Sequence, residues 1–139
     1  MLFGRRERKM KRLLIVEDEP LVAFDNEHFL TDLGYDIVGT VDNAKAACAM
    51  IADGGIDLIL SDVTLSRGSS GRDVALAAKD ADIPVLFVTA SCPIDAPALS
   101  VGCLAKPYTQ RALKLAIEAV EAHLSGGPPK RAVRGLRLY

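Results

Sequence analysis

Residues 57–62 read Asp-Leu-Ile-Leu-Ser-Asp, a short apolar run that ends in a carboxylate. Its apolar residues are continuous, which is typical of a strand buried on both faces of a parallel sheet. Similar runs occupy residues 12–16 and 85–89, and two less continuous or shorter runs occupy 36–40 and 103–105, respectively. We therefore expect five strands, of which the third carries Asp62 at its carboxyl end.

Amphipathic, helix-like segments separate these runs. Pro20 suits the first position of a helix, and Asp42 and Thr109 suit the N-cap position before one. The helices expected on this basis cover residues 21–33, 43–52, 72–79 and 110–124. Strands that alternate with helices predict βαβ units with right-handed crossovers, and hence a doubly wound α/β sheet.

The segment between the last two strands departs from this pattern. It contains Pro93 and Pro97 and few strong helix formers. Proline inside a helix costs roughly 3 kcal/mol. We therefore expect the fourth helix to be shortened to a single turn or absent.

The length of 139 residues favours one domain, and the net charge of −1 conceals an uneven distribution. Residues 1–11 and 125–139 are basic tails, whereas the body at 12–124 is acidic. We expect the C-terminal tail to be disordered, and the tails to be solvated ends rather than contacts for nucleic acid or an acidic partner. Whether Met10 is the true start stays open.

Cysteine content and hydropathy bear on the compartment. No apolar run approaches the roughly 18 residues that cross a bilayer, and the short run after the basic N-terminus is not a secretory signal. We therefore expect a cytoplasmic protein with its cysteines Cys48, Cys92 and Cys103 reduced. Cys92 and Cys103 could lie near each other, which leaves redox sensing as a less favoured alternative.

Chemically distinctive residues follow four of the five strands. Glu17 and Asp18 follow the first, Asp62 follows the third, Thr89 ends the fourth, and Lys106 follows the fifth. In a doubly wound sheet the carboxyl ends of the strands form the functional crevice. Each residue alone is a weak signal, but their order and placement together indicate a single site.

Crowded carboxylates repel one another unless a cation neutralises them, and Mg²⁺ prefers oxygen ligands of this kind. Asp62 is then positioned to attack phosphorus and form an acyl phosphate. Lys106 and the metal would neutralise charge on the phosphoryl oxygens, and the Thr89 hydroxyl would donate a hydrogen bond to them.

These residues also carry a family resemblance. Across residues 12–124 the sequence resembles the receiver domain of two-component response regulators. The matching stretches are Leu13-Leu-Ile-Val-Glu-Asp-Glu-Pro20, Asp57-Leu-Ile-Leu-Ser-Asp-Val63, Val85-Leu-Phe-Val-Thr-Ala90 and Leu104-Ala-Lys-Pro-Tyr108. The resemblance implies a flavodoxin-like sheet in the order 2-1-3-4-5. It also implies phosphorylation of Asp62 by a histidine kinase or a histidine phosphotransfer protein.

The resemblance implies a ligand set for Mg²⁺, namely Glu17, Asp18, Asp62 and the backbone carbonyl of Thr64, with Thr89 and Lys106 at the phosphoryl group. Three features depart from the family pattern. Cys103 stands where an aromatic switch residue is usual, which places ring-based signalling in doubt. The shortened fourth helix belongs to the face through which many relatives dimerise, which makes that dimer less favoured here. The loop 64–71 is rich in glycine and serine, and we expect Gly68 and Gly71 to admit left-handed backbone conformations.

We therefore predict a stand-alone, cytoplasmic receiver that is a phosphoprotein and not an enzyme acting on other substrates. Its output would be a protein–protein contact or the draining of phosphate from a kinase, without direct DNA binding, as a monomer or atypical dimer. Three alternatives stay open: a degenerate receiver that binds partners without phosphorylation, a Mg²⁺-dependent aspartyl-phosphate phosphatase, and a fragment of a larger regulator. The sequence names neither the kinase, the stimulus nor the downstream partner.

Overall fold

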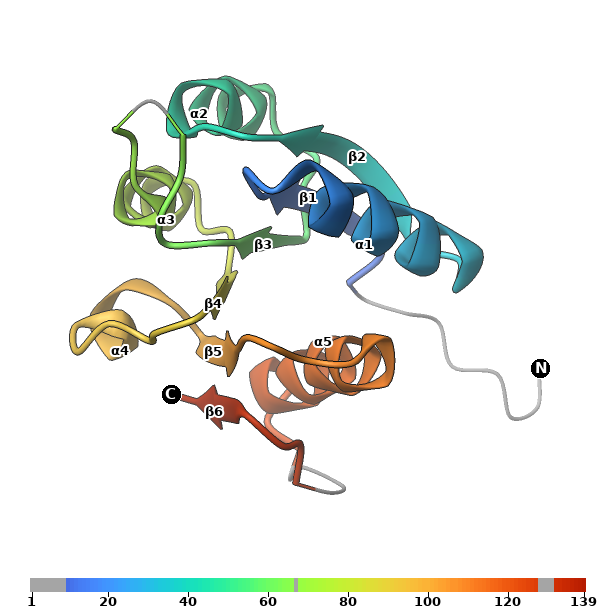
Figure 1. Ribbon diagram of the computed structural model, residues 1–139. Coiled ribbons are helices and arrows are strands. Elements are labelled where there is room, and N and C mark those ends of the chain that lie inside the picture. Colours follow the sequence, from blue (N-terminus) through green and yellow to red (C-terminus); the bar gives the residue numbers. More distant parts are fainter. Residues whose placement is uncertain (1–9, 67, 128–131) are drawn as a thin grey trace, which may run out of the picture.

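The structure is a computed structural model that describes residues 10–66, 68–127 and 132–139 of the chain. Within these residues, strands and helices alternate from the N-terminus to the end of the fifth helix (Figure 1). The elements are β1 Arg12–Val16, α1 Pro20–Asp32, β2 Asp36–Val41, α2 Ala44–Asp53, β3 Leu58–Ser61, α3 Gly71–Asp80, β4 Val85–Thr89, α4 Ala96–Leu99, β5 Gly102–Ala105, α5 Gln110–Leu124 and β6 Leu136–Leu138.

One sheet holds all the strands, in the order β2-β1-β3-β4-β5-β6. Strands β1 to β5 are parallel, which confirms the predicted doubly wound sheet and its 2-1-3-4-5 order. The strand order reverses between β1 and β3, so the carboxyl ends of these two neighbouring parallel strands border the crevice that such folds use for function.

The continuous apolar runs bury both faces of the sheet. Successive residues of β1 alternate between the faces: Leu13 and Ile15 pack with α1 and α5, whereas Leu14 and Val16 pack with α2 and α3. All four residues are at most 2% exposed. A strand covered by helices on both sides needs apolar residues at every position, which is why its sequence shows no alternation.

Local signals set most of the helix ends. Pro20 is the first residue of α1, and the Thr109 side chain caps α5 by accepting a hydrogen bond from the Ala112 N–H. The predicted cap at Asp42 was wrong by one residue: α2 is capped by Asn43, whose side chain accepts from the Ala46 N–H. Both residue types have the short polar side chain that a cap requires, so the sequence did not distinguish them.

The predicted shortening of the fourth helix is confirmed, because α4 has only four residues. The prediction of a disordered C-terminal tail was wrong for Leu136–Leu138, which form β6 and pair antiparallel with β5. Leu136 and Leu138 also pack against the core beside α5, and this burial of apolar surface stabilises the strand. Figure 1 shows β6 at the outer edge of the sheet.

No helix among the described residues is both long and apolar enough to span a bilayer.

Candidate functional site

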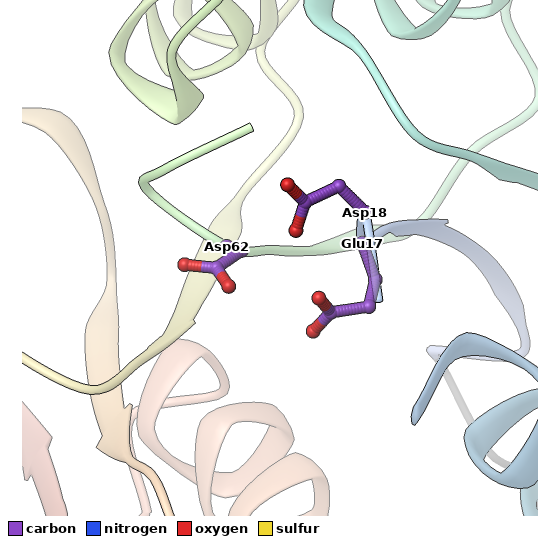
Figure 2. Close-up of side chains that lie close together, drawn as sticks. All are labelled: Glu17, Asp18 and Asp62. Carbon is purple, nitrogen blue, oxygen red and sulfur yellow. The ribbon is translucent and has the colours of Figure 1, made fainter. Parts of the chain in front are cut away.

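Three carboxylates meet at the carboxyl ends of β1 and β3. Glu17 and Asp18 follow β1, Asp62 follows β3, and these strands are paired in register up to Val16 and Ser61. One carboxylate oxygen from each of the three lies within 4.8 Å of the others. In Figure 2 the side chains of Glu17 and Asp18 extend toward Asp62. We call Glu17, Asp18 and Asp62 the acidic cluster.

Asp62 is held on both of its oxygens. Oδ1 accepts hydrogen bonds from the backbone N–H groups of Val63 at 2.7 Å and Thr64 at 3.3 Å. Oδ2 accepts one from Lys106 Nζ at 2.8 Å. The residue is 8% exposed, and these three hydrogen bonds fix the orientation of its carboxylate. A carboxylate held in one orientation is well suited to act as a nucleophile.

Lys106 joins the end of β5 to the acidic cluster. Its ammonium group donates to Glu17 Oε1 and to Asp62 Oδ2, both at 2.8 Å, and lies 3.5 Å from Glu19 Oε1. Burial opposes a charged amine, but the hydrogen bonds to Asp62 and Glu17 outweigh it and raise the pKa of Lys106 well above its usual range. Lys106 therefore stays protonated and supplies a permanent positive charge beside Asp62.

Glu17 is the most buried acid of the cluster, at 5% exposed. Burial raises the pKa of Glu17, and the hydrogen bond from Lys106 partly counteracts that rise. Its second oxygen accepts from the Glu19 backbone N–H at 3.1 Å. Desolvation, rather than repulsion from Asp62, is therefore the main cause of the raised pKa of Glu17.

The donor set fits a hard divalent cation. The cluster offers only carboxylate oxygens, which Mg²⁺ prefers, and the half-buried Asp18 accepts a long contact of 3.5 Å from the Ser66 hydroxyl. Glu17, Asp18 and Asp62 are the residues that would hold the ion. The predicted contribution of the Thr64 carbonyl stays a prediction, although Thr64 follows Asp62 closely and its backbone bridges to Ser70.

Thr89 is connected to Lys106 through its backbone. Its carbonyl accepts a hydrogen bond from the Lys106 N–H at 2.8 Å, so the ends of β4 and β5 are tied together. Its hydroxyl is buried and lies 3.5 Å from both the backbone nitrogen and oxygen of Ser91. The structure thus joins Glu17, Asp62 and Lys106 by side-chain contacts, and connects Thr89 to them through the main chain.

Sequence reasoning missed several supporting residues. Gly71 packs so closely that a Cβ there would lie 2.1 Å from the Asp62 carbonyl oxygen. The prediction that it adopts a left-handed conformation was wrong: Gly68 has a φ of 68°, whereas Gly71 is absent from the positive-φ glycines of the described chain. Gly71 is required for close approach to the backbone of Asp62, which a glycine-rich stretch alone does not reveal.

A buried hydrogen bond beside Lys106 was also missed. Asn26 on α1 donates from Nδ2 to the Tyr108 hydroxyl at 2.8 Å. Tyr108 follows the cis Lys106–Pro107 peptide bond. The contact ties the segment that carries Lys106 to α1, and its only sequence signal is a polar residue at a buried helical position.

The prediction of three reduced cysteines was wrong for two of them. Cys92 and Cys103 form a disulfide, with their Cα atoms 6.2 Å apart, and Cys48 is free. The expectation that Cys92 and Cys103 could be neighbours is confirmed. The short α4 brings the chain straight back from Cys92 to β5, which places the two Cα atoms within disulfide range.

Comparison with known proteins identifies the family to which the sequence belongs. The family model of the response regulator receiver domain matches residues 13–118, about three quarters of the chain. The chain belongs to the response regulator receiver domain family. Proteins of this family typically bind Mg²⁺ at an acidic site, and this chain has an acidic cluster.

Individual relatives agree with this assignment. The chain is 39% identical over 80 residues to the phyllosphere-induced regulator PhyR of Methylorubrum extorquens, covering 56% of this chain but only 30% of PhyR. It is 29% identical to the chemotaxis protein CheY of Pseudomonas aeruginosa, covering 83% of this chain and 99% of CheY. The solution structure of SdrG from Sphingomonas melonis Fr1 is similar at a TM-score of 0.68 and 38% identity, covering 80% of this chain and 96% of SdrG.

Proposed function

We propose that this receiver domain is a phosphoacceptor switch whose phosphorylated residue is Asp62. The observation that carries the proposal is the acidic cluster, in which Asp62 is fixed by backbone N–H groups on one oxygen and by Lys106 on the other. An Asp62 oxygen attacks the phosphorus of a phosphohistidine, the phosphorus–nitrogen bond breaks, and the histidine leaves with a proton from solvent. The product is an acyl phosphate on Asp62.

The residues around Asp62 have separate roles in this step. Lys106 neutralises charge on the transferring phosphoryl group, and it is already protonated for that purpose. The Thr89 hydroxyl is the nearest side-chain donor at the end of β4, and exchanges its long contacts with Ser91 for a phosphoryl oxygen. A bound Mg²⁺ supplies further neutralising charge at the cluster.

Output is proposed to be a contact with another protein, without direct DNA binding. Phosphorylation adds about −1.5 to −2 charge, and such charge biases a two-state loop arrangement. One similar structure, at 27% identity and a TM-score of 0.72, is named an anti-anti-sigma factor, PhyR of Bartonella quintana; this chain covers 52% of it. That name supports a protein partner. Transfer from a histidine kinase or phosphotransfer protein is proposed to take place in the cytosol.

The direct test is Mg²⁺-dependent labelling by acetyl phosphate, read as the added phosphoryl mass on intact protein. We expect the wild type to be labelled once, Asp62→Asn to be unlabelled, and chelation by EDTA to abolish labelling. Asp80→Asn is the matched control, because Asp80 is an exposed acid at the end of α3. Labelling of Asp62→Asn at another residue would refute the assignment.

The same assay separates the other functions. A wild type that is never labelled, with Mg²⁺ and with a panel of histidine kinases from the same organism, would favour a binding module that does not use phosphorylation. Turnover of a phosphorylated small molecule would favour a phosphatase. Replacing Glu17 and Asp18 together by alanine is expected to abolish the Mg²⁺-dependent labelling, because only Asp62 of the cluster would remain to hold the ion.

A further inference from the structure

The disulfide between Cys92 and Cys103 connects two elements next to the phosphorylation site. Cys92 lies in the loop between β4 and α4, three residues after Thr89, and Cys103 lies in β5, three residues before Lys106. Strands β4 and β5 are paired, with Phe87 opposite Cys103 and Thr89 opposite Ala105. The bond therefore closes a loop whose two ends lead directly to Thr89 and Lys106.

The two cysteines differ in burial. Cys103 is fully buried in the core between β4 and β6, whereas Cys92 is only partly buried and packs against that core. Of the two residues, Cys92 is therefore the one that a small thiol from solvent would reach first. This asymmetry suits a bond that is broken and re-formed from one side.

Among the described residues, few other contacts hold the loop. Arg72 at the start of α3 forms an exposed, bidentate ion pair with Asp95, with both N···O distances at 3.1 Å, and Ala96 is buried against the core. Ile94 is fully exposed and α4 is a single turn. Without the disulfide, residues 90–95 would be held by this exposed ion pair, by the long contacts of Ser91 with the Thr89 hydroxyl, and by the hydrogen bond from the Ala96 N–H to the Pro93 carbonyl.

We propose that Cys92 and Cys103 are a reversible redox-modification site that controls the loop after Thr89. The inference rests on the proposed function of Asp62. In the cytosol a protein disulfide is usually transient or redox-sensing. In the oxidised form the loop is tied to β5, which restricts the movement by which Thr89 reaches a phosphoryl group; in the reduced form the loop is released.

The chemistry balances with two co-reactants. Oxidation by hydrogen peroxide removes one hydrogen from each thiol, forms the sulfur–sulfur bond, breaks the oxygen–oxygen bond and releases two waters. Reduction is by a dithiol protein: its thiolate attacks the Cys92 sulfur, Cys103 leaves and takes up a proton, and the second thiol of the reductant frees Cys92 and becomes oxidised.

The test compares the protein after hydrogen peroxide and after a thioredoxin-type dithiol, in the native state. Alkylation of the denatured samples is expected to modify Cys48 alone after oxidation and all three cysteines after reduction. Hydrogen exchange in residues 90–101 is expected to be faster in the reduced form. Labelling by acetyl phosphate is expected to be slower in the oxidised form by about fivefold or more, the lower end of ordinary coupling between sites.

Two variants make the result specific. Cys92→Ser replaces the less buried of the two cysteines and is expected to match the reduced wild type under both treatments, whereas Cys48→Ser is expected to keep the full difference. Three free thiols after peroxide, a native disulfide that the dithiol does not reduce, or oxidised and reduced forms with equal exchange and labelling would each overturn the proposal. Equal absence of labelling with a difference in exchange would instead refute the role of Asp62 and leave the redox site supported.

Discussion

Replacement of Lys106 by methionine removes the ammonium group that bridges Glu17 and Asp62. The variant keeps a side chain of similar length, but two charge-assisted hydrogen bonds of 2.8 Å are lost. Such bonds contribute roughly 1.5–3 kcal/mol each. Two buried carboxylates would also face each other without a counter-charge. Part of this loss is offset because the variant no longer buries a charged amine, which removes the cost of its desolvation. We expect the free energy of unfolding to fall by about 3 kcal/mol at pH 7.5.

The loss is expected to depend on pH. Burial already raises the pKa of Glu17 in the wild type, and removal of Lys106 raises that pKa further. A carboxyl that binds a proton more readily folded than unfolded favours folding once it is protonated. The deficit of the variant therefore shrinks as pH falls toward 5. In the wild type the raised pKa of Lys106 gives stability that is complete below its usual value near 10.5 and is lost only as pH rises past its folded value.

Urea unfolding followed by circular dichroism measures these differences, at pH 7.5 and pH 5, with and without Mg²⁺. At pH 7.5 the expected loss corresponds to a drop in Tm of roughly 10 °C. Excess Mg²⁺ is expected to restore part of the stability, because an ion that binds only the folded cluster shifts the equilibrium. Lys114→Met is the control: its ion pair with Glu118 is exposed and should change stability by less than about 0.5 kcal/mol. A variant as stable as the wild type at pH 7.5, or a deficit unchanged by both pH and Mg²⁺, would refute the reasoning.

Three further changes test the framework around the site, each by the same urea assay. Gly71→Ala would place a Cβ 2.1 Å from the Asp62 carbonyl oxygen, so we expect the free energy of unfolding to fall by about 2 kcal/mol or more and the labelling of Asp62 to be slower. In the control Gly127→Ala, the added Cβ meets no atom of the described residues closer than 3.5 Å, and the substitution should be close to neutral. Equal effects of the two substitutions would contradict the packing role of Gly71. Tyr108→Phe removes the partner of the buried Asn26 amide and should cost about 1–2 kcal/mol, and no loss would show that this hydrogen bond does not stabilise the Lys106 segment. Asn43→Ala should cost about 1 kcal/mol as the loss of a helix cap, whereas Asp42→Ala should not, and the reverse order would restore the cap predicted from sequence.

One feature of the sequence predicted both the parallel sheet and the position of the candidate site residues at one edge of it. Buried strands leave a continuous apolar run, and a residue that directly follows such a run must lie at the carboxyl edge of the sheet. This is why Glu17, Asp18, Asp62 and Lys106 were placed together without any knowledge of distances. The resemblance to receiver domains added the expected roles, and the family assignment is confirmed.

Features that depend on contacts between distant segments were not predictable in this way. The tail that contains β6 is short and basic, and Leu136–Leu138 are stabilised as a strand by pairing with the edge of β5 and by packing of Leu136 and Leu138 against the core. The pairing of Cys92 with Cys103 depends on the path of a loop whose helix is reduced to one turn. The bond of Lys106 to both Glu17 and Asp62 likewise depends on side-chain reach, which order along the chain does not encode.

The charge of the site explains why a lysine and a cation can both be needed. The three carboxylates of the acidic cluster carry −3, and Lys106 reduces this to −2. A divalent cation would bring the sum to zero, which removes the repulsion that an incoming phosphoryl group would otherwise meet. Lys106 alone therefore holds the unphosphorylated site together but leaves it too negative for phosphoryl transfer. The charge balance therefore predicts different effects for two changes. Chelation of Mg²⁺ should abolish labelling of the wild type, but it should lower the free energy of unfolding far less than the Lys106→Met substitution does.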